Sequence, residues 1–216
     1  MPTILYEDPH LLLIEKPMGI PSQDTDGDCV PRRLAERGYP VKVVHRLDVP
    51  TGGVMVYTRT DRATAKVSAM VGQHDRFQKE YLAVVQGYPE EPRGTLNDLL
   101  YHDVRRNKSY TVNRPRKGVR DAKLDYAVLE TVTTEEGVFS LVRVRLHTGR
   151  THQIRVQFAS RKMPLYGDSR YGGVKGKHLG LWSHCLTLPH PITNETLSAE
   201  SKPDWSLAPW CWFKRI

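Results

Sequence analysis

The sequence predicts an α+β fold built on a large, mainly antiparallel or mixed β-sheet flanked by helices and loops. Short apolar runs typical of strands outnumber helical segments, without the regular strand–helix alternation of a parallel α/β sheet. Two adjacent segments, Leu124–Val132 and Val138–Leu146, alternate apolar and polar residues and predict a hairpin closed near Glu135–Gly137. No internal repeat or low-complexity tract is visible, so we expect one domain over residues 1–216.

The N-terminal half alternates short apolar runs with polar turns. Val30–Arg37 fits a short helix, because Gly38 suits the left-handed residue that follows many helices. A second helix begins at Asp61, which we expect to be its N-cap, and Thr51–Gly53 predicts a flexible turn. The predicted strands are Ile4–Tyr6, Leu11–Ile14, Val41–Val44, Val54–Tyr57 and Tyr81–Val85.

Strands dominate the C-terminal half as well. Besides the hairpin, Ser109–Val112, Trp182–Leu188 and Glu195–Ala199 have strand-like patterns. A helix beginning near Thr151 places Ile154 and Phe158 on one face, four residues apart. We expect the four tryptophans (Trp182, Trp205, Trp210 and Trp212) to serve packing rather than base stacking.

Charge and cysteine content narrow the class of protein. A formal net charge of +8 favours a polyanionic partner, although charge alone does not choose among RNA, DNA, anionic lipid and simple solubility. The three cysteines lack a close pairing, which fits a reducing cytosol, and histidines do not join them at zinc-site spacing. No signal peptide or membrane segment is visible, so we expect a cytoplasmic protein that binds neither metal nor membrane.

The first segment rich in chemistry is His45–Gly53. An apolar strand leads directly into His45, Arg46 and Asp48, and a glycine pair then allows backbone or ligand to approach closely. A carboxylate beside cations stays ionised and is available as a nucleophile or base. The alternative is an ordinary aspartate that caps a turn at a strand end.

The second such segment is Leu146–Arg155, which predicts a strand, a tight turn and the start of a helix. It gathers two arginines and two histidines, and a helix start beside arginine suits a phosphate or a carboxylate. A solvated basic turn is the alternative. Zinc at His147 and His152 is disfavoured, because residues five apart do not share a helical face.

Residues 101–123 carry a dense set of cations that suits an RNA backbone. The alternative is a solvated basic loop. The cations are Arg105, Arg106, Lys108, Arg114, Arg116, Lys117, Arg120 and Lys123.

The motifs resemble the RluA family of pseudouridine synthases. The block His45-Arg46-Leu47-Asp48-x-x-Thr51-x-Gly53 is similar to the family signature. Four further blocks follow the family's order and cover roughly residues 3–200. They are Leu5–Asp8 with Glu15-Lys16-Pro17-x-Gly19, Lys79-x-Tyr81, Thr148-Gly149-Arg150-x-His152–Arg155, and Pro164-Leu165-x-Gly167-Asp168 with Tyr171-Gly172.

The resemblance implies roles for individual residues. Asp48 matches the catalytic aspartate, Tyr81 the aromatic residue that stacks on the target base, and Arg150 the basic residue that pairs with the aspartate. Arg46 matches a residue that fills the gap left by the departing base. The candidate RNA-binding residues are His45, Arg46, Thr51, His152, Gln153, Arg155, Arg105, Arg106 and Lys108.

The resemblance also implies an RNA uridine isomerase without metal or organic cofactor, and we expect a monomer that acts on an rRNA or tRNA stem-loop. Gly52 departs from the family's usual serine, which we expect to change shape rather than chemistry. The motifs start at Ile4, so we expect no N-terminal S4 domain and target choice by the catalytic domain itself. The rival functions are a non-enzymatic RNA-binding protein and a nuclease. Metal-dependent nucleases need clustered carboxylates, and Asp48 has no acidic neighbour in sequence.

Overall fold

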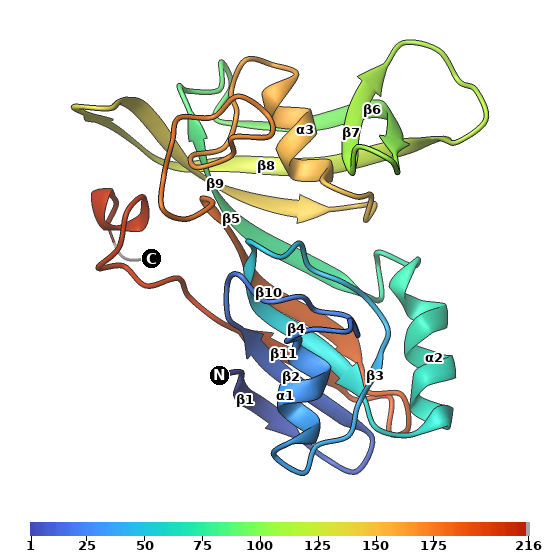
Figure 1. The fold of residues 1–216 in the computed structure, drawn as a ribbon. Coiled ribbons are helices and arrows are strands. Elements are labelled where there is room, and N and C mark those ends of the chain that lie inside the picture. Colours follow the sequence, from blue (N-terminus) through green and yellow to red (C-terminus); the bar gives the residue numbers. More distant parts are fainter. Residues whose placement is uncertain (215–216) are drawn as a thin grey trace. The chain divides into compact units, whose positions relative to one another are not determined.

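The computed structural model describes residues 1–214, which form two compact units. The first unit joins Met1–Glu80 to Trp182–Pro203, and the second joins Tyr81–Leu181 to the C-terminal segment from Asp204 (Figure 1). The single domain expected over residues 1–216 stays a prediction. No helix in the described residues is long and apolar enough to cross a membrane.

Strands greatly outnumber helices in both units, as the sequence predicts. The elements in chain order are β1 (Thr3–Glu7), β2 (Leu11–Lys16), α1 (Val30–Ala35), β3 (Lys42–Val43), β4 (Gly52–Thr58), α2 (Asp61–Val71), β5 (Gln78–Gln86), β6 (Arg93–Asp103), β7 (Lys108–Val112), β8 (Val119–Thr134), β9 (Gly137–Leu146), α3 (Gln153–Ala159), β10 (Leu181–Pro189), β11 (Thr196–Glu200) and the 3-10 turn η1 (Trp210–Trp212).

The first unit is built on a mixed sheet in the order β1-β2-β4-β10, with β3 beside β4 and β11 beside β10. The pairs β1–β2, β2–β4 and β10–β11 are antiparallel. Strands β4 and β10 run parallel, with Gly52 opposite Trp182 and Gly53 opposite Ser183. The expected α+β fold with a mixed sheet is therefore confirmed.

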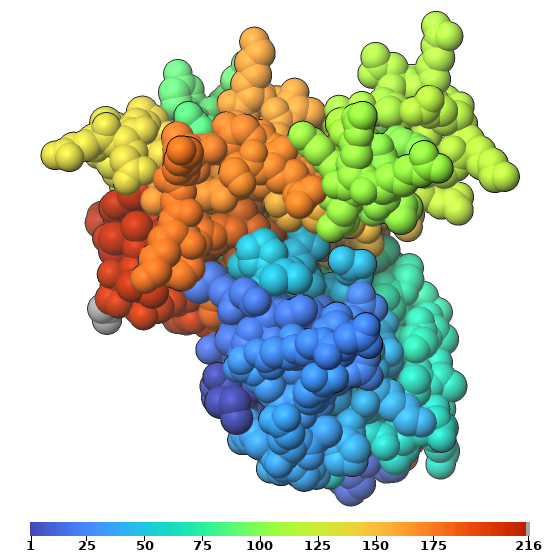
Figure 2. Space-filling model, viewed as in Figure 1, coloured from blue at the N-terminus to red at the C-terminus, as the bar shows by residue number. Residues whose placement is uncertain are grey.

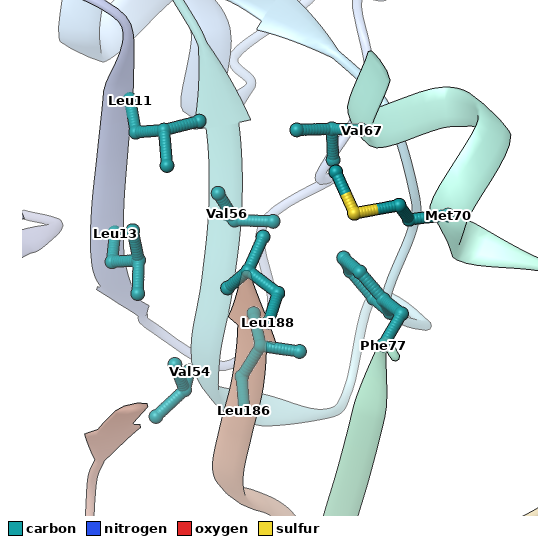
Figure 3. Close-up of a cluster of buried hydrophobic side chains, with 9 residues drawn as sticks. All are labelled: Leu11, Leu13, Val54, Val56, Val67, Met70, Phe77, Leu186 and Leu188. Atoms are coloured by element: carbon teal, nitrogen blue, oxygen red, sulfur yellow. The ribbon is translucent and has the colours of Figure 1, made fainter. Parts of the chain in front are cut away.

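Strand β4 is buried along its whole length, because both of its faces are covered. On one face, Val54 and Val56 join a cluster with α2 and the neighbouring strands (Figure 3). On the other face, the Tyr57 hydroxyl donates to the carbonyl of Ser22, in the loop before α1. The remaining members of the cluster are Leu11, Leu13, Val67, Met70, Phe77, Leu186 and Leu188.

The start of α2 differs from the sequence prediction by one residue. Thr60, not Asp61, is the N-cap, because its backbone is extended and its side-chain oxygen accepts from the amide of Ala63. Asp61 is the first helical residue, where its negative charge still favours the helix start. Both residue types are good N-caps, so the sequence alone does not separate them.

The predicted flexible turn Thr51–Gly53 is also wrong in part. Gly52 and Gly53 are the first two residues of β4. A Cβ at Gly52 would lie 2.3 Å from the Trp182 ring, and one at Gly53 would lie 2.1 Å from the carbonyl oxygen of Ser183. The glycines therefore allow two strands to approach each other, a use that glycine has inside strands.

The second unit holds strands in the order β5-β9-β8-β6-β7, and its hairpin β8–β9 extends the predicted one at the turn, where Thr134 pairs with Gly137. Strand β6 was not predicted from the sequence. It contains Gly94, Asn97 and Asp98, which are residue types that strands usually avoid. Its long antiparallel pairing with β8 supplies the stabilisation that the local sequence lacks.

Helix α3 packs on the sheet of the second unit, beside β6 and β7 (Figure 1). Ile154 and Phe158 are buried on one face, as predicted, and Val156 packs with Leu100 and Ala122. The helix begins at Gln153, close to the predicted start near Thr151, and its N-cap His152 has left-handed backbone angles.

Candidate active site

The loop that carries Asp48 is fixed on both sides of that residue. On one side, the Ser22 hydroxyl donates to the carbonyl of Leu47 (2.9 Å) and accepts from the Leu47 amide (3.1 Å). On the other side, the Val49 carbonyl accepts from the amide of Gly19 (2.8 Å). The amide of Thr51 donates to the Asp48 carbonyl, which closes a tight turn. These bonds hold the half-buried Asp48 in a defined place.

Lys16 lies fully buried beneath this loop, at the end of β2. Its ammonium donates to the carbonyls of Pro17 (2.8 Å), Ile20 (2.8 Å) and Val49 (3.3 Å). Burial lowers the pKa of Lys16 to about 8, although the negative charge of Asp48 acts in the opposite direction. A buried ammonium thus lies under the loop that carries Asp48, bonded to the carbonyl of the next residue.

His45 is a neutral histidine that packs inside the first unit. Its Nε2 accepts from the amide of Val56, and its ring meets Phe77 edge-on at 5.3 Å. Burial lowers the pKa of His45 to about 3, with a smaller contribution from the charge of Lys79. Its Nδ1 has no hydrogen-bond partner among the described residues. RNA contact by His45 stays a prediction.

The other predicted residues of this loop differ in exposure. Arg46 is exposed, whereas Thr51 is buried and its hydroxyl has no partner within residues 1–214. Lys79 is buried too, with its ammonium over the Phe77 ring, and burial lowers its pKa to about 8.

In the second unit, Gln153 organises the turn before α3. Its side-chain oxygen accepts from the Thr148 hydroxyl (2.7 Å) and from the Arg150 amide (3.0 Å), and its amide nitrogen donates to the Lys123 carbonyl. The Arg150 side chain is exposed, and its Nε donates to the Asp121 carbonyl at 2.9 Å. Gln153 thus ties the turn to β8, and Arg150 projects from it.

Arg155 is the buried arginine of the same segment. Its Nε and Nη2 donate to both carboxylate oxygens of Asp168, at 2.6 and 2.8 Å, in a fork-shaped pair. Its guanidinium also lies 5.3 Å from the centre of the Tyr171 ring. The Tyr171 hydroxyl in turn meets Nδ1 of His152 at 3.0 Å.

The structure brings the predicted residues together in two groups. His45, Asp48 and Thr51 share the first unit, while Arg150, His152 and the other residues of the α3 turn share the second. Tyr81 also belongs to the second unit, where its side chain is buried in β5. Pairing between Asp48 and Arg150, and stacking by Tyr81, stay predictions.

The basic segment 101–123 spans the end of β6, strand β7, the loop to β8 and the first residues of β8. Seven of its eight cations are exposed and Lys108 is half-buried; Figure 2 shows the segment (lime green) projecting from the second unit. The Arg170 side chain donates to the carbonyls of Arg106 and Asn107, both at 3.0 Å, which fixes the turn of the hairpin.

Sequence reasoning missed the roles of Lys16, Ser22 and Tyr171. Lys16 and Tyr171 lie in family motifs, and this position is the sequence signal that could have indicated a role. Ser22 lies outside these motifs, so no sequence signal indicates its role. Within residues 1–214, no group of three or more His, Cys, Asp or Glu side chains is arranged to hold a metal ion.

Comparison with known proteins identifies the family. A family model described as RNA pseudouridylate synthase matches residues 10–160, which include the Asp48 loop and the turn before α3. The chain belongs to this family. The resemblance to the RluA-type synthases is thereby confirmed.

Several curated relatives are similar over most of the chain. The uncharacterized RNA pseudouridine synthase YhcT of Bacillus subtilis is 35% identical over 212 residues, covering 92% of this chain and 67% of the relative. An uncharacterized RNA pseudouridine synthase of Mycobacterium bovis is 34% identical, covering 88% and 65%. The chain therefore spans about two thirds of the length of these relatives. The dual-specificity RNA pseudouridine synthase RluA of Haemophilus influenzae is 30% identical, covering 94% and 93%.

A solved structure supports the fold assignment. Human RNA pseudouridylate synthase domain containing 1 superposes with a TM-score of 0.80 at 23% identity, covering 98% of this chain and 88% of that protein. The sheet-dominated fold of the pseudouridylate synthases is therefore shared.

Proposed function

We propose that this chain isomerises uridine to pseudouridine in structured RNA, with Asp48 as the catalytic carboxylate. The observation that carries the proposal is the fixed position of Asp48, held through Leu47 by Ser22 and through Val49 by the buried Lys16. Membership of the pseudouridylate synthase family supports the same reaction. A loop that only capped a turn would not need a fully buried ammonium beneath it.

The reaction breaks the bond between N1 of uracil and C1′ of ribose and forms a bond from C5 to C1′. Ionised Asp48 either attacks C1′ or removes the proton from C2′ to give a glycal, and both routes need its negative charge. After the uracil turns and rejoins through C5, the C5 proton leaves and N1 gains a proton. The atoms balance without any other reactant.

Tyr81 and Arg150 complete the proposed machinery. Stacking on Tyr81 would keep the detached uracil beside the sugar, an interaction typically worth ~1–3 kcal/mol per base. Arg150 would pair with Asp48 and orient it. The substrate is an rRNA or tRNA stem-loop, because a uridine must leave its stack to react and loops lower that cost. A relative from Xanthomonas campestris, 33% identical, is named a ribosomal large subunit pseudouridine synthase, which supports rRNA as a substrate.

Asp48→Asn tests the proposal, because it removes the charge and preserves the shape. RNA labelled with tritium at C5 of uridine releases tritium when pseudouridine forms. We expect release by the wild type, none by Asp48→Asn, and nearly unchanged RNA affinity and thermal stability in the variant.

Asp26→Asn is the matched control, since it removes an exposed carboxylate from another loop of the same unit. It should leave tritium release unchanged. Substantial release by Asp48→Asn would refute the catalytic role. If the wild type bound structured RNA without any release, the chain would instead be a non-enzymatic RNA-binding protein.

A further inference from the structure

The β6–β7 hairpin of the second unit has one side packed against α3 and one side turned away from it. Leu100 of β6 and Ala122 of β8 lie on the packed side, where both contact Val156 of the helix. Because side chains alternate along a strand, the odd-numbered residues of β6 point to the opposite side. We call that side the outer face; it consists of Leu99, Tyr101 and Asp103 on β6 and their partners Val112, Tyr110 and Lys108 on β7.

Two tyrosines lie side by side on the outer face. Tyr101 and Tyr110 are direct cross-strand partners, so their side chains stand next to each other. Both are half-buried, as are Leu99 and Val112. The face of an antiparallel sheet that meets water usually carries polar side chains, whereas this one presents aromatic and aliphatic groups at the edge of the sheet.

A cation lies against each of the two rings. The guanidinium of Arg116, from the loop after β7, lies 4.8 Å from the centre of the Tyr101 ring. The ammonium of Lys108 lies 5.7 Å from the centre of the Tyr110 ring. Residues 101–123 as a whole carry eight cations and only two carboxylates. The outer face therefore combines aromatic rings with an excess of positive charge, which is the chemistry of surfaces that bind single-stranded nucleic acid.

Contacts outside the outer face hold the hairpin in place. The Ser109 amide donates to the Tyr171 oxygen (2.8 Å), and the Ser109 hydroxyl donates to the Thr151 carbonyl (2.6 Å), so β7 is tied to two loops. Arg170 fixes the turn of the hairpin through two backbone carbonyls. A surface that is ordered before it binds loses little conformational freedom on binding, which favours affinity.

We propose that the outer face binds a single-stranded segment of the substrate RNA, with bases stacking on Tyr101 and Tyr110 and phosphates meeting the cations beside them. This role rests on the proposed function, and it adds contacts to bases where the basic segment alone offers contacts to phosphates. Every base has an aromatic face, so stacking on tyrosine requires no particular sequence. Arg116 suits the same surface, because bases also stack on a guanidinium plane. The unpaired nucleotides of a stem-loop are the part of the substrate that fits this surface.

The first test separates bases from phosphates. The probe is an oligoadenylate of about ten nucleotides, which is long enough to cover such a surface and contains no uridine to react. A strand of the same length with abasic sites keeps the phosphates and loses the stacking groups. We expect the wild type to bind oligoadenylate at least about fivefold more tightly than the abasic strand. Equal affinities, or no measurable binding of oligoadenylate, would overturn the proposal.

The second test assigns the stacking to the two tyrosines. Tyr101→Leu and Tyr110→Leu each remove a ring and keep an apolar side chain, so each should weaken oligoadenylate binding about fivefold or more. Affinity for the abasic strand and the slope of log affinity against log salt should stay nearly unchanged, because no phosphate contact is lost. Tyr101→Phe and Tyr110→Phe restore the ring and should restore most of the affinity. Tyr88→Leu is the control, since Tyr88 is a 68% exposed tyrosine of the same unit outside the outer face. Wild-type binding by both leucine variants would refute the stacking.

NMR of the wild type gives a result that does not depend on the folding of any variant. The ring protons of Tyr101 and Tyr110 should move upfield when oligoadenylate is added, since a stacked base shields them, and should move much less with the abasic strand. The Tyr88 ring should not move. Unmoved Tyr101 and Tyr110 rings in a complex that forms would overturn the proposal. The probe contains no uridine, so failure of this surface and failure of the isomerase function remain distinguishable: tritium release reports only on the reaction, and the ring shifts report only on the surface.

Discussion

The ammonium of Lys16 donates to the carbonyl of Val49, the residue that follows Asp48, across 33 positions of the chain. The same ammonium holds the carbonyls of Pro17 and Ile20, so one side chain joins the end of β2 to two loops. Three donors of one lysine match three carbonyls. The position of Asp48 thus depends on a group that lies below the loop and does not need to touch RNA.

Lys16→Met should change how stability depends on pH. Because burial lowers the pKa of Lys16 to about 8, the folded protein releases this proton before the unfolded chain does, and the free energy of unfolding rises with pH above about 8. Between pH 8 and 10 the contribution is about 2–3 kcal/mol. Urea unfolding should show a smaller rise in Lys16→Met, with Lys177→Met, an exposed control, matching the wild type. Identical pH slopes in all three proteins would contradict the pKa.

His45→Gln tests a second buried group, and its pH window lies on the acid side. Since the pKa of His45 is lowered to about 3, the unfolded chain binds a proton below pH 6.5 that the folded protein does not, and stability falls as pH falls. From pH 7 to pH 5 the loss is about 2 kcal/mol. Glutamine keeps an acceptor for the Val56 amide without titrating. Chemical unfolding should therefore show a smaller acid loss in His45→Gln, and an equal loss would show that other groups cause it.

The two arginines of the α3 segment should respond differently to replacement by lysine. Because Arg150 is exposed, Arg150→Lys should keep the melting temperature of the wild type. If Arg150 orients Asp48, the loss of its planar guanidinium should lower the maximal rate about 100-fold. Arg155→Lys breaks the buried fork to Asp168 and should lower the melting temperature by several degrees. If Arg150→Lys keeps its full rate, Arg150 is not the partner of Asp48. A rate loss confined to Arg155→Lys, without loss of stability, would transfer that role to Arg155.

Neutralising Arg105 and Arg106 should separate RNA holding from chemistry. Arg170 holds the turn through backbone carbonyls, so Arg105→Gln/Arg106→Gln should keep its shape. Each lost phosphate contact should lower the slope of log affinity against log salt by roughly 0.7–0.9, while the rate at saturating RNA stays nearly constant. Lys108 is left intact because it contacts Tyr171. An unchanged salt slope would show that this segment is only a solvated surface. The control is Arg62→Gln/Lys177→Gln, which removes two exposed cations outside the segment and should leave the salt slope as in the wild type.

Local signals explain what the sequence predicted well. The strand pairs at the N-terminus, the β8–β9 hairpin and the buried face of α3 all follow from periodicity. The order of the motifs indicates the pseudouridine synthase family without any information on the fold, and the family model matches the same family. The N-cap of α2 was misplaced because Thr60 and Asp61 are adjacent and both suited to capping.

The positioning groups were beyond prediction because they depend on tertiary contacts. A lysine at a strand end usually extends its charge into water, and only the folded loops show that Lys16 meets three carbonyls. Tyr171 is similar, since its partner Ser109 lies 62 positions away. Strand β6 was missed because its stability comes from β8 and not from its own residues.

The residue at position 52 and the residue at position 182 constrain each other in evolution. The indole of Trp182 occupies the space in which a side chain at position 52 would stand, with a Cβ only 2.3 Å from the ring. A relative with serine at this position therefore needs a smaller or differently directed residue opposite it. We expect the two positions to covary among homologues, and a chain that acquired serine first would pass through a less stable ancestor.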